Sequence, residues 1–222
     1  TGGLVQDISH AVLPSIKPIH TLLLTLVAML PILWRVWHKP SPREFVPAVG
    51  LCALVAFLFG WHVHEKAILT AILPLALHCA ESAGASRMFW FLQLAGHASL
   101  LPLLFTPHET PVKICLVVGH SMCSYAVLSR RQKDAAARGD ISGKSDLLGP
   151  IGVMYSVGFF AVQAFESLIQ PVFLAKYQFL PLLLWSTYCA VGLISCGGFY
   201  VYHFATARDT IASNKVSSAV SS

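Results

Sequence analysis

The chain has 222 residues, of which 55% are hydrophobic and only 11% are charged. An ordinary soluble domain carries about 25% charged residues, because its surface has to interact with water. The low charge therefore excludes an ordinary soluble globular domain. The net charge of +5 does not indicate nucleic-acid binding, because the cations lie in short loops and form no basic stripe interleaved with aromatics.

Apolar segments follow one another along the chain, and a membrane span needs about 20 apolar residues. The second and third segments are short for a span, and all the boundaries are approximate. The pattern predicts an all-α, polytopic transmembrane helical bundle over residues 1–206. Its seven expected spans are 19–37, 45–60, 67–79, 88–104, 112–128, 147–165 and 179–202.

Basic residues alternate between rich and poor loops along the chain. The loop after the first segment carries Arg35, Lys39 and Arg43, and the polar linker 129–146 carries the largest number of cations. The alternate loops hold one lysine each, namely Lys17, Lys66, Lys113 and Lys176. The positive-inside rule therefore predicts a cytosolic linker and a cytosolic, disordered tail at 207–222, with the lysine loops on the lumenal side.

A lumenal start without a signal peptide favours earlier spans upstream, so we expect the C-terminal half of a larger bundle. The six cysteines all lie within apolar segments and form no CxxC motif or zinc-finger spacing. Nor does the sequence contain a phosphate-binding glycine loop. The cysteine pattern therefore predicts no metal site.

One polar cluster, Trp61-His62-Val63-His64-Glu65-Lys66, separates the second and third apolar segments. A single helix over 45–79 would be about 52 Å long, against a hydrocarbon core of about 30 Å. The chain is therefore expected to break here. Ionic side chains in a membrane cost about 2.5–3.5 kcal/mol at its centre and less near its surface, so they are functional candidates.

The cluster suits the binding of a phosphate group. Lys66 supplies a positive charge, and His62 or His64 supplies a hydrogen-bond donor that can be charged near neutral pH. Glu65 can orient a histidine or offset Lys66. The alternative is a loop ion pair with two interfacial histidines, and a metal site is disfavoured because no third ligand lies nearby in the sequence.

Four segments resemble the dolichyl-phosphate-glucose-dependent α-1,3-glucosyltransferases of lipid-linked oligosaccharide assembly. The second of them contains the polar cluster, and together they extend over nearly the whole chain. Within that family, His62 favours the branch that acts on the monoglucosylated acceptor. The four segments are GLVQDISHAVLPSIKP (3–18), FLFGWHVHEKAILTAILPLAL (57–77), HASLLPLLFTPHETPVKI (97–114) and KYQFLPLLLWSTYCAVGL (176–193).

The resemblance implies a membrane glycosyltransferase (GT-C type) fold in the endoplasmic reticulum membrane, with a lumenal active face. It implies inverting transfer of glucose from dolichyl-phosphate glucose to the monoglucosylated lipid-linked oligosaccharide, without a cofactor. The donor phosphate would be bound by His62, His64, Glu65 and Lys66, and His108 and Glu109 are candidates for contact with the acceptor glycan. The general base would lie upstream of Thr1, so the chain alone is expected to be inactive.

Two alternatives remain open at the level of the sequence. The same chemistry could act on the unglucosylated acceptor. In another class, the chain could belong to a polytopic lipid or sugar transporter, which would predict broken helices at symmetric positions in two halves. The sequence shows one such break, at the 61–66 cluster, and no matching second one.

Overall fold

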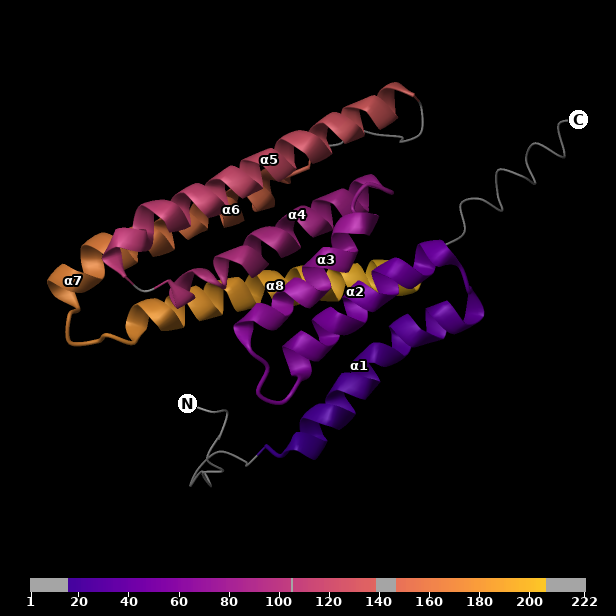
Figure 1. Cartoon of the computed structure of the whole chain (residues 1–222), viewed down its shortest axis with the longest axis horizontal. Helices are drawn as coiled ribbons and strands as arrows, with labels where there is room; N and C mark the ends of the chain where they lie inside the picture. The colour runs from indigo at the N-terminus through magenta and orange to yellow at the C-terminus, as the bar shows by residue number, and fades with distance from the viewer. Residues whose placement is uncertain (1–15, 105, 139–146, 207–222) are drawn as a thin grey trace, which may run out of the picture.

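The computed structural model describes residues 16–104, 106–138 and 147–206, and these residues form helices and no strand (Figure 1). The all-α fold class predicted from the sequence is therefore confirmed. The helices are α1 (Pro18–His38), α2 (Pro42–Phe59), η1 (Glu65–Ala67), α3 (Ile68–His78), α4 (Ala83–Ala98), η2 (Leu101–Leu103), η3 (Pro107–Glu109), α5 (Thr110–Ala137), α6 (Gly149–Ala164), the π-helical turn η4 (Phe165–Ile169), α7 (Gln170–Phe173) and α8 (Leu180–Thr206).

Five of these helices are long and apolar enough to cross a membrane, which makes the chain a multi-pass membrane protein. They are α1, α2, α5, the continuous helix Gly149–Phe173 and α8. The other two predicted spans also form helices, but α3 has 11 residues and α4 has 16. Both are shorter than the roughly 17–25 residues that a span requires.

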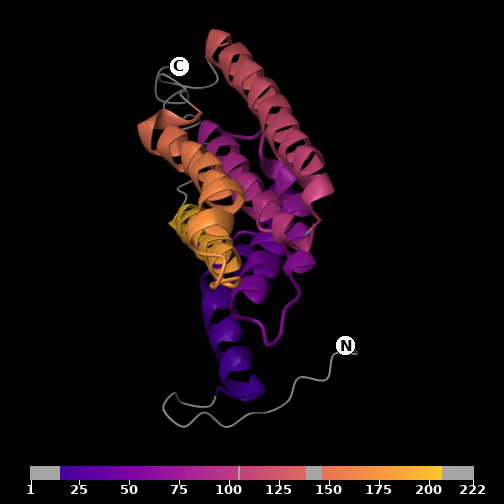
Figure 2. The same cartoon turned by 90° about the vertical axis from the view of Figure 1, so that its left-hand side faces the viewer.

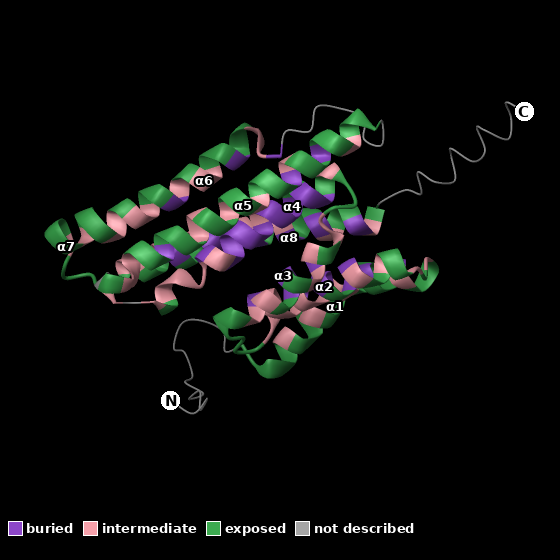
Figure 3. Ribbon diagram, turned by 45° about the horizontal axis from the view of Figure 1, so that its top comes forward, coloured by how far each residue is buried: buried purple, intermediate pink, exposed green. Residues whose placement is uncertain are grey.

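Helix α4 forms the centre of the bundle. Eleven of its sixteen residues are buried, and it packs against α3, α5 and α8 (Figure 3). A helix that is apolar on all sides is stable only when neighbours surround it. The outer faces of α1, α5 and α6 are instead rich in exposed leucine, valine and isoleucine, as expected for surfaces in contact with lipid.

Glycines allow the inner helices to approach closely. A Cβ atom on Gly50 of α2 would lie 2.6 Å from the Cγ of Leu75 in α3. On Gly96 of α4, it would lie 2.7 Å from the Cδ1 of Ile72. Small residues of this kind are common where membrane helices pack, because association there depends on close van der Waals contact.

Arg35 differs from its predicted position in a loop. It lies inside α1, only 8% exposed, and forms a bidentate ion pair with Glu44 of α2 (Nε to Oε2 2.9 Å, Nη2 to Oε1 2.6 Å). Its guanidinium also lies 5.3 Å from the ring centroid of Phe204 in α8. The ion pair joins α1 to α2, because a buried guanidinium requires a partner for its charge, and the ring contact adds α8.

Helix α5 extends to Ala137, so the first part of the predicted polar linker 129–146 is helical. This stretch is rich in Arg, Gln, Lys and Ala, all strong helix formers. It also packs, since Gln132 is buried and its amide nitrogen lies 3.4 Å from the carbonyl oxygen of Ala83. The rest of the linker, 139–146, and the tail, 207–222, lie outside the described residues.

The connections alternate between the two ends of the bundle (Figure 1). The α2–α3, α4–α5 and α7–α8 connections share one end, which we call the site end. The α1–α2 and α3–α4 connections share the other, with the last turns of α5 and α8. Every described arginine lies on a helix segment at that second end or, for Arg138, directly after one, and we call this end the arginine end.

Candidate functional site

The loop that carries the predicted site lies between α2 and η1. Helix α2 ends at Phe59, and a Cβ atom on Gly60 would lie 2.4 Å from the carbonyl oxygen of Ala56, so glycine is required there. His62 follows with a φ of +48°, in the left-handed region. His64 then caps η1. The predicted break in the helix is therefore confirmed.

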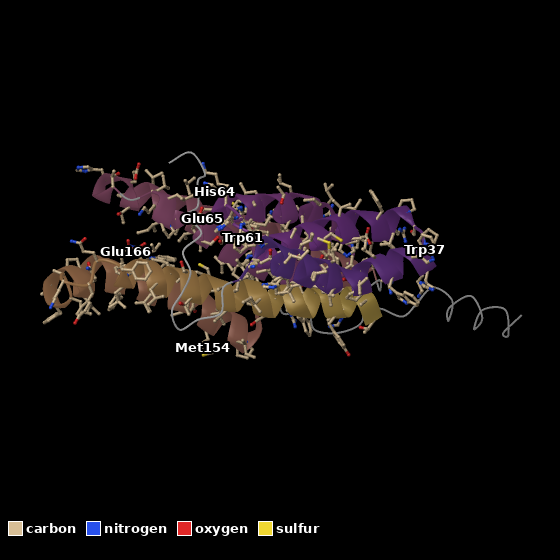
Figure 4. All side chains as sticks on the ribbon, turned by 90° about the horizontal axis from the view of Figure 1, so that it is seen from below. Trp37, Trp61, His64, Glu65, Met154 and Glu166 are labelled. Atoms are coloured by element: carbon tan, nitrogen blue, oxygen red, sulfur yellow. The ribbon has the colours of Figure 1, made fainter. Side chains whose placement is uncertain are left out.

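All six residues from Trp61 to Lys66 are exposed. Figure 4 shows Trp61, His64 and Glu65 close to one another. The Nδ1 atom of His64 lies 3.0 Å from Oε2 of Glu65 and 3.4 Å from the backbone nitrogen of Lys66. One nitrogen cannot donate to the carboxylate and accept from an N–H at the same time. The shorter contact favours a proton on Nδ1 that His64 donates to Glu65, so Glu65 is placed to orient this histidine.

The arrangement leaves positive groups available to an anion. With Nδ1 directed at Glu65, the Nε2 atom of His64 faces away from that carboxylate, and a doubly protonated ring would donate from it. Lys66 adds a flexible ammonium two residues further on. The ring of His62 packs edge to face on Trp61, with centroids 4.3 Å apart. Such a group of donors suits a phosphate oxygen.

The metal alternative finds no support in the described residues. No three His, Cys, Asp or Glu side chains come together there as potential metal ligands. Nδ1 of His64 is also directed at Glu65 and is not open to a metal ion.

His108 and Glu109, the candidate glycan contacts, lie in η3 at the same end of the bundle. His108 is exposed, and Oε2 of Glu109 accepts a hydrogen bond from the backbone N–H of Thr106 (3.0 Å). The Thr106 hydroxyl and backbone N–H both hold the pKa of Glu109 below its usual range. Glu109 therefore stabilises its own loop, and His108 is the more available of the two.

A second polar group involves Glu166, which no spacing in the sequence singled out. The indole N–H of Trp185 donates to Oε2 of Glu166 over 2.7 Å, and the amide of Gln163 donates to Ser167 over 2.9 Å. Glu166 lies in the π-helical turn of a candidate span, apart from the segment that carries Trp61, His64 and Glu65 (Figure 4). No local sequence signal could link Glu166 to Trp185, since they meet only through packing.

Comparison with known proteins gives one family and a consistent set of relatives. Residues 1–200 match the ALG6, ALG8 glycosyltransferase family. A protein of Mus musculus is 43% identical over 199 residues, which cover 87% of this chain and 36% of the relative. A protein of Coccidioides immitis is 39% identical over 208 residues (93% and 40%), and one of Arabidopsis thaliana is 36% identical over 200 residues (87% and 39%).

All three relatives carry the name dolichyl pyrophosphate Glc1Man9GlcNAc2 alpha-1,3-glucosyltransferase. The chain spans well under half of their length. No solved structure matches it.

Proposed function

This chain belongs to the ALG6, ALG8 glycosyltransferase family, and we propose that it forms the donor-binding part of an α-1,3-glucosyltransferase. The acceptor is the monoglucosylated oligosaccharide on dolichyl pyrophosphate, by analogy with the relatives' names. The donor is dolichyl-phosphate glucose. The observation that carries the proposal is the exposed cluster of His62, His64 and Lys66, with Glu65 hydrogen-bonded to His64.

The cluster would act on the leaving group of the transfer. An acceptor hydroxyl oxygen attacks the anomeric carbon of the glucose, and the bond from that carbon to the phosphate oxygen breaks. The phosphate departs with the bonding electron pair, and the hydroxyl proton passes to a base that we expect upstream of Thr1. Charge accumulates on the phosphate, so Lys66 and the His64 ring stabilise the transition state more than the ground state.

The orientation of the bundle follows from the same proposal. The site end would face the lumen of the endoplasmic reticulum, where His108 would contact the acceptor glycan, and the arginine end would face the cytosol. The distribution of basic residues supports this orientation, because arginine and lysine accumulate on the cytosolic side of membrane proteins.

The test is glucose transfer by the natural full-length protein in microsomes supplied with dolichyl-phosphate glucose. Acceptors with zero, one or two glucoses are offered separately. We expect transfer only to the monoglucosylated acceptor. His64→Ala and Lys66→Ala should each lower the rate about 100-fold or more, the usual loss when one stabilising donor is removed.

The matched control is Lys176→Ala, an exposed lysine in another loop at the site end. Its rate should stay close to that of the unmodified protein. Equal rates in His64→Ala, Lys66→Ala and the control would refute the phosphate-binding role. Transfer to the unglucosylated acceptor would show that the proposed acceptor is wrong. No transfer to any acceptor would favour the transporter class.

A further inference from the structure

Two charged side chains are buried in the described part of the chain, Arg35 at 8% exposure and Lys113 at 6%. Arg35 has Glu44 as its ion-pair partner. Lys113, in contrast, forms no hydrogen bond and no ion pair with any described residue. A buried charge without a partner is costly, so a group of opposite charge normally accompanies it. The structure leaves room for such a group at Lys113.

Lys113 was predicted in a loop, but it lies in the first turn of α5 at the site end. The Cα–Cβ bonds of a helix tilt toward its N-terminus, so the lysine stem leads back toward η3. The pKa of Glu109 in η3 is lowered first by the hydrogen bonds from Thr106 and then by the charge of Lys113. The ammonium of Lys113 is therefore directed at the start of α5, where Glu109 offsets its charge only beyond ion-pairing distance.

The start of α5 adds partial positive charge to that of Lys113. Aligned peptide dipoles place roughly half an elementary charge at a helix N-terminus, and no side chain caps the N-terminus of α5. Glu109 does not fill this position, because its Oε2 accepts the hydrogen bond from the Thr106 backbone N–H within its own loop. A buried ammonium next to an uncapped helix N-terminus has the chemistry of an anion-binding site.

Lys113 also lies at the depth where a membrane carries its phosphate groups. The apolar segment of α5, residues 112–128, measures about 26 Å, against about 30 Å for the hydrocarbon core. Lys113 is the second residue of that segment, so it lies at the boundary between hydrocarbon and head groups. Its long stem allows the ammonium to reach the head-group layer. An anion bound here would therefore be one that a lipid chain holds at the membrane surface.

This position is separate from the proposed donor site. Figure 2 views the bundle from the site end, where α5 and the α2–α3 connection lie apart. The 61–66 cluster occupies the α2–α3 connection and has its own cations. Transfer between two lipid-linked substrates requires that both are held at the same surface of the membrane. A second phosphate site at the site end therefore suits the second substrate.

We propose that Lys113 and the N-terminus of α5 bind the pyrophosphate of the lipid-linked acceptor. This inference rests on the proposed function, in which the acceptor is the second phosphate-bearing substrate. A pyrophosphate diester carries two negative charges, and both the ammonium and the helix N-terminus attract them. The exposed His108, five residues before Lys113, would contact a sugar of the attached glycan. Lys113 would bind the substrate without touching the reacting atoms.

The experiment measures binding separately from transfer, with the natural full-length protein in phosphatidylcholine nanodiscs. The probes are dolichyl pyrophosphate, dolichyl phosphate and phosphatidylserine, none of which carries a sugar, and native mass spectrometry counts the retained molecules. Lys113→Met keeps the apolar stem and removes the charge. It should weaken the binding of dolichyl pyrophosphate about thirtyfold, which corresponds to about 2 kcal/mol for one charge-assisted hydrogen bond. Lys113→Arg keeps the charge and should restore most of the binding.

The donor cluster offers a matched comparison. Lys66→Ala should weaken the binding of dolichyl phosphate and leave that of dolichyl pyrophosphate unchanged, and Lys113→Met should do the reverse. Lys176→Met removes an exposed lysine from another loop at the site end and should change neither. In transfer assays, Lys113→Met should raise the KM for the acceptor and leave the KM for the donor unchanged.

Three results would overturn the proposal. The first is unchanged binding of dolichyl pyrophosphate in Lys113→Met. The second is an equal loss of dolichyl phosphate, which would place Lys113 in the donor site, and the third is equal retention of phosphatidylserine, which would show a general attraction to anionic lipids. If Lys113→Met lowers the melting temperature, Lys113→Gln replaces it in the same comparisons. Binding of dolichyl pyrophosphate that depends on Lys113, without transfer to any acceptor, would contradict the proposed function alone.

Discussion

At the scale of single residues, His62 has both an unusual backbone conformation and a side chain that is a candidate to bind phosphate. Its φ of +48° lies in the left-handed region, which costs an ordinary residue about 1–2 kcal/mol. Glycine and asparagine adopt that conformation more readily. Nothing in the sequence pattern distinguished His62 from His64 in this respect. The observation separates two possible roles of His62, as a turn residue and as a donor to phosphate.

We predict different effects for three substitutions of His62. His62→Gly and His62→Asn should preserve the loop and remove the imidazole, so amide hydrogen exchange over 60–67 should not change while glucose transfer falls. His62→Val should accelerate exchange as well, because a β-branched residue resists a positive φ. Full transfer activity in His62→Asn would restrict His62 to a role in the turn, and unchanged exchange in His62→Val would contradict the strain.

The partner of Glu65 within the polar cluster also differs from the simplest expectation. Glu65 and Lys66 are neighbours in the sequence, which suggested a simple loop ion pair as the alternative. The structure instead brings Glu65 to His64 at 3.0 Å. Because the residues are adjacent, the sequence allows Glu65 to contact either His64 or Lys66. Which of the two it contacts depends on side-chain rotamers and on the turn at His62.

At the scale of helices, length and burial separate α3 and α4 from the others. Hydropathy predicted seven spans, the second and third of them short, and all seven segments form helices. Periodicity cannot distinguish a helix surrounded by lipid from one surrounded by other helices, because both are apolar on all sides. Only the packing shows that α4 is the centre of the bundle and that the outer faces of α5 and α6 are exposed.

The close contact of α2 with α3 leads to a prediction about Gly50. In Gly50→Ala the new methyl group would meet the Cγ of Leu75 at 2.6 Å and the carbonyl oxygen of Ala71 at 3.2 Å. We expect about 1–3 kcal/mol of destabilisation, seen as a lower melting temperature in detergent. Gly198→Ala is the control, since nothing lies within 4 Å of its added carbon. Equal melting temperatures of the two variants would contradict the close packing.

At the scale of the whole molecule, the connections between helices alternate between two ends of the bundle, and this alternation decides which loops lie together. It places the 61–66 loop with the 106–109 loop and leaves the arginines at the opposite end. The partly buried ion pair of Arg35 with Glu44 fixes α1 against α2 at the arginine end. Breaking such a pair is costly, because it leaves one charge without a partner.

The orientation of the bundle is testable with two exposed cysteine substitutions. Asp134→Cys on α5 should react with a membrane-impermeant maleimide in sealed microsomes. Gln178→Cys in the α7–α8 connection should react only after permeabilisation. The unmodified protein is the control, since its own cysteines lie in apolar segments. Reaction of both variants in sealed microsomes would contradict the alternation, and the reverse pattern would invert the orientation.

The sequence by itself determined the membrane class, the seven helical segments and the break at the 61–66 cluster. These properties depend on the composition and length of short segments, so residues close together in the sequence are enough to predict them. Tertiary structure alone decided that α4 is buried, that Arg35 pairs with Glu44, that Glu166 meets Trp185 and that Lys113 is buried at the start of α5. Each of these joins residues from different helices, and their proximity depends on packing that no local pattern encodes.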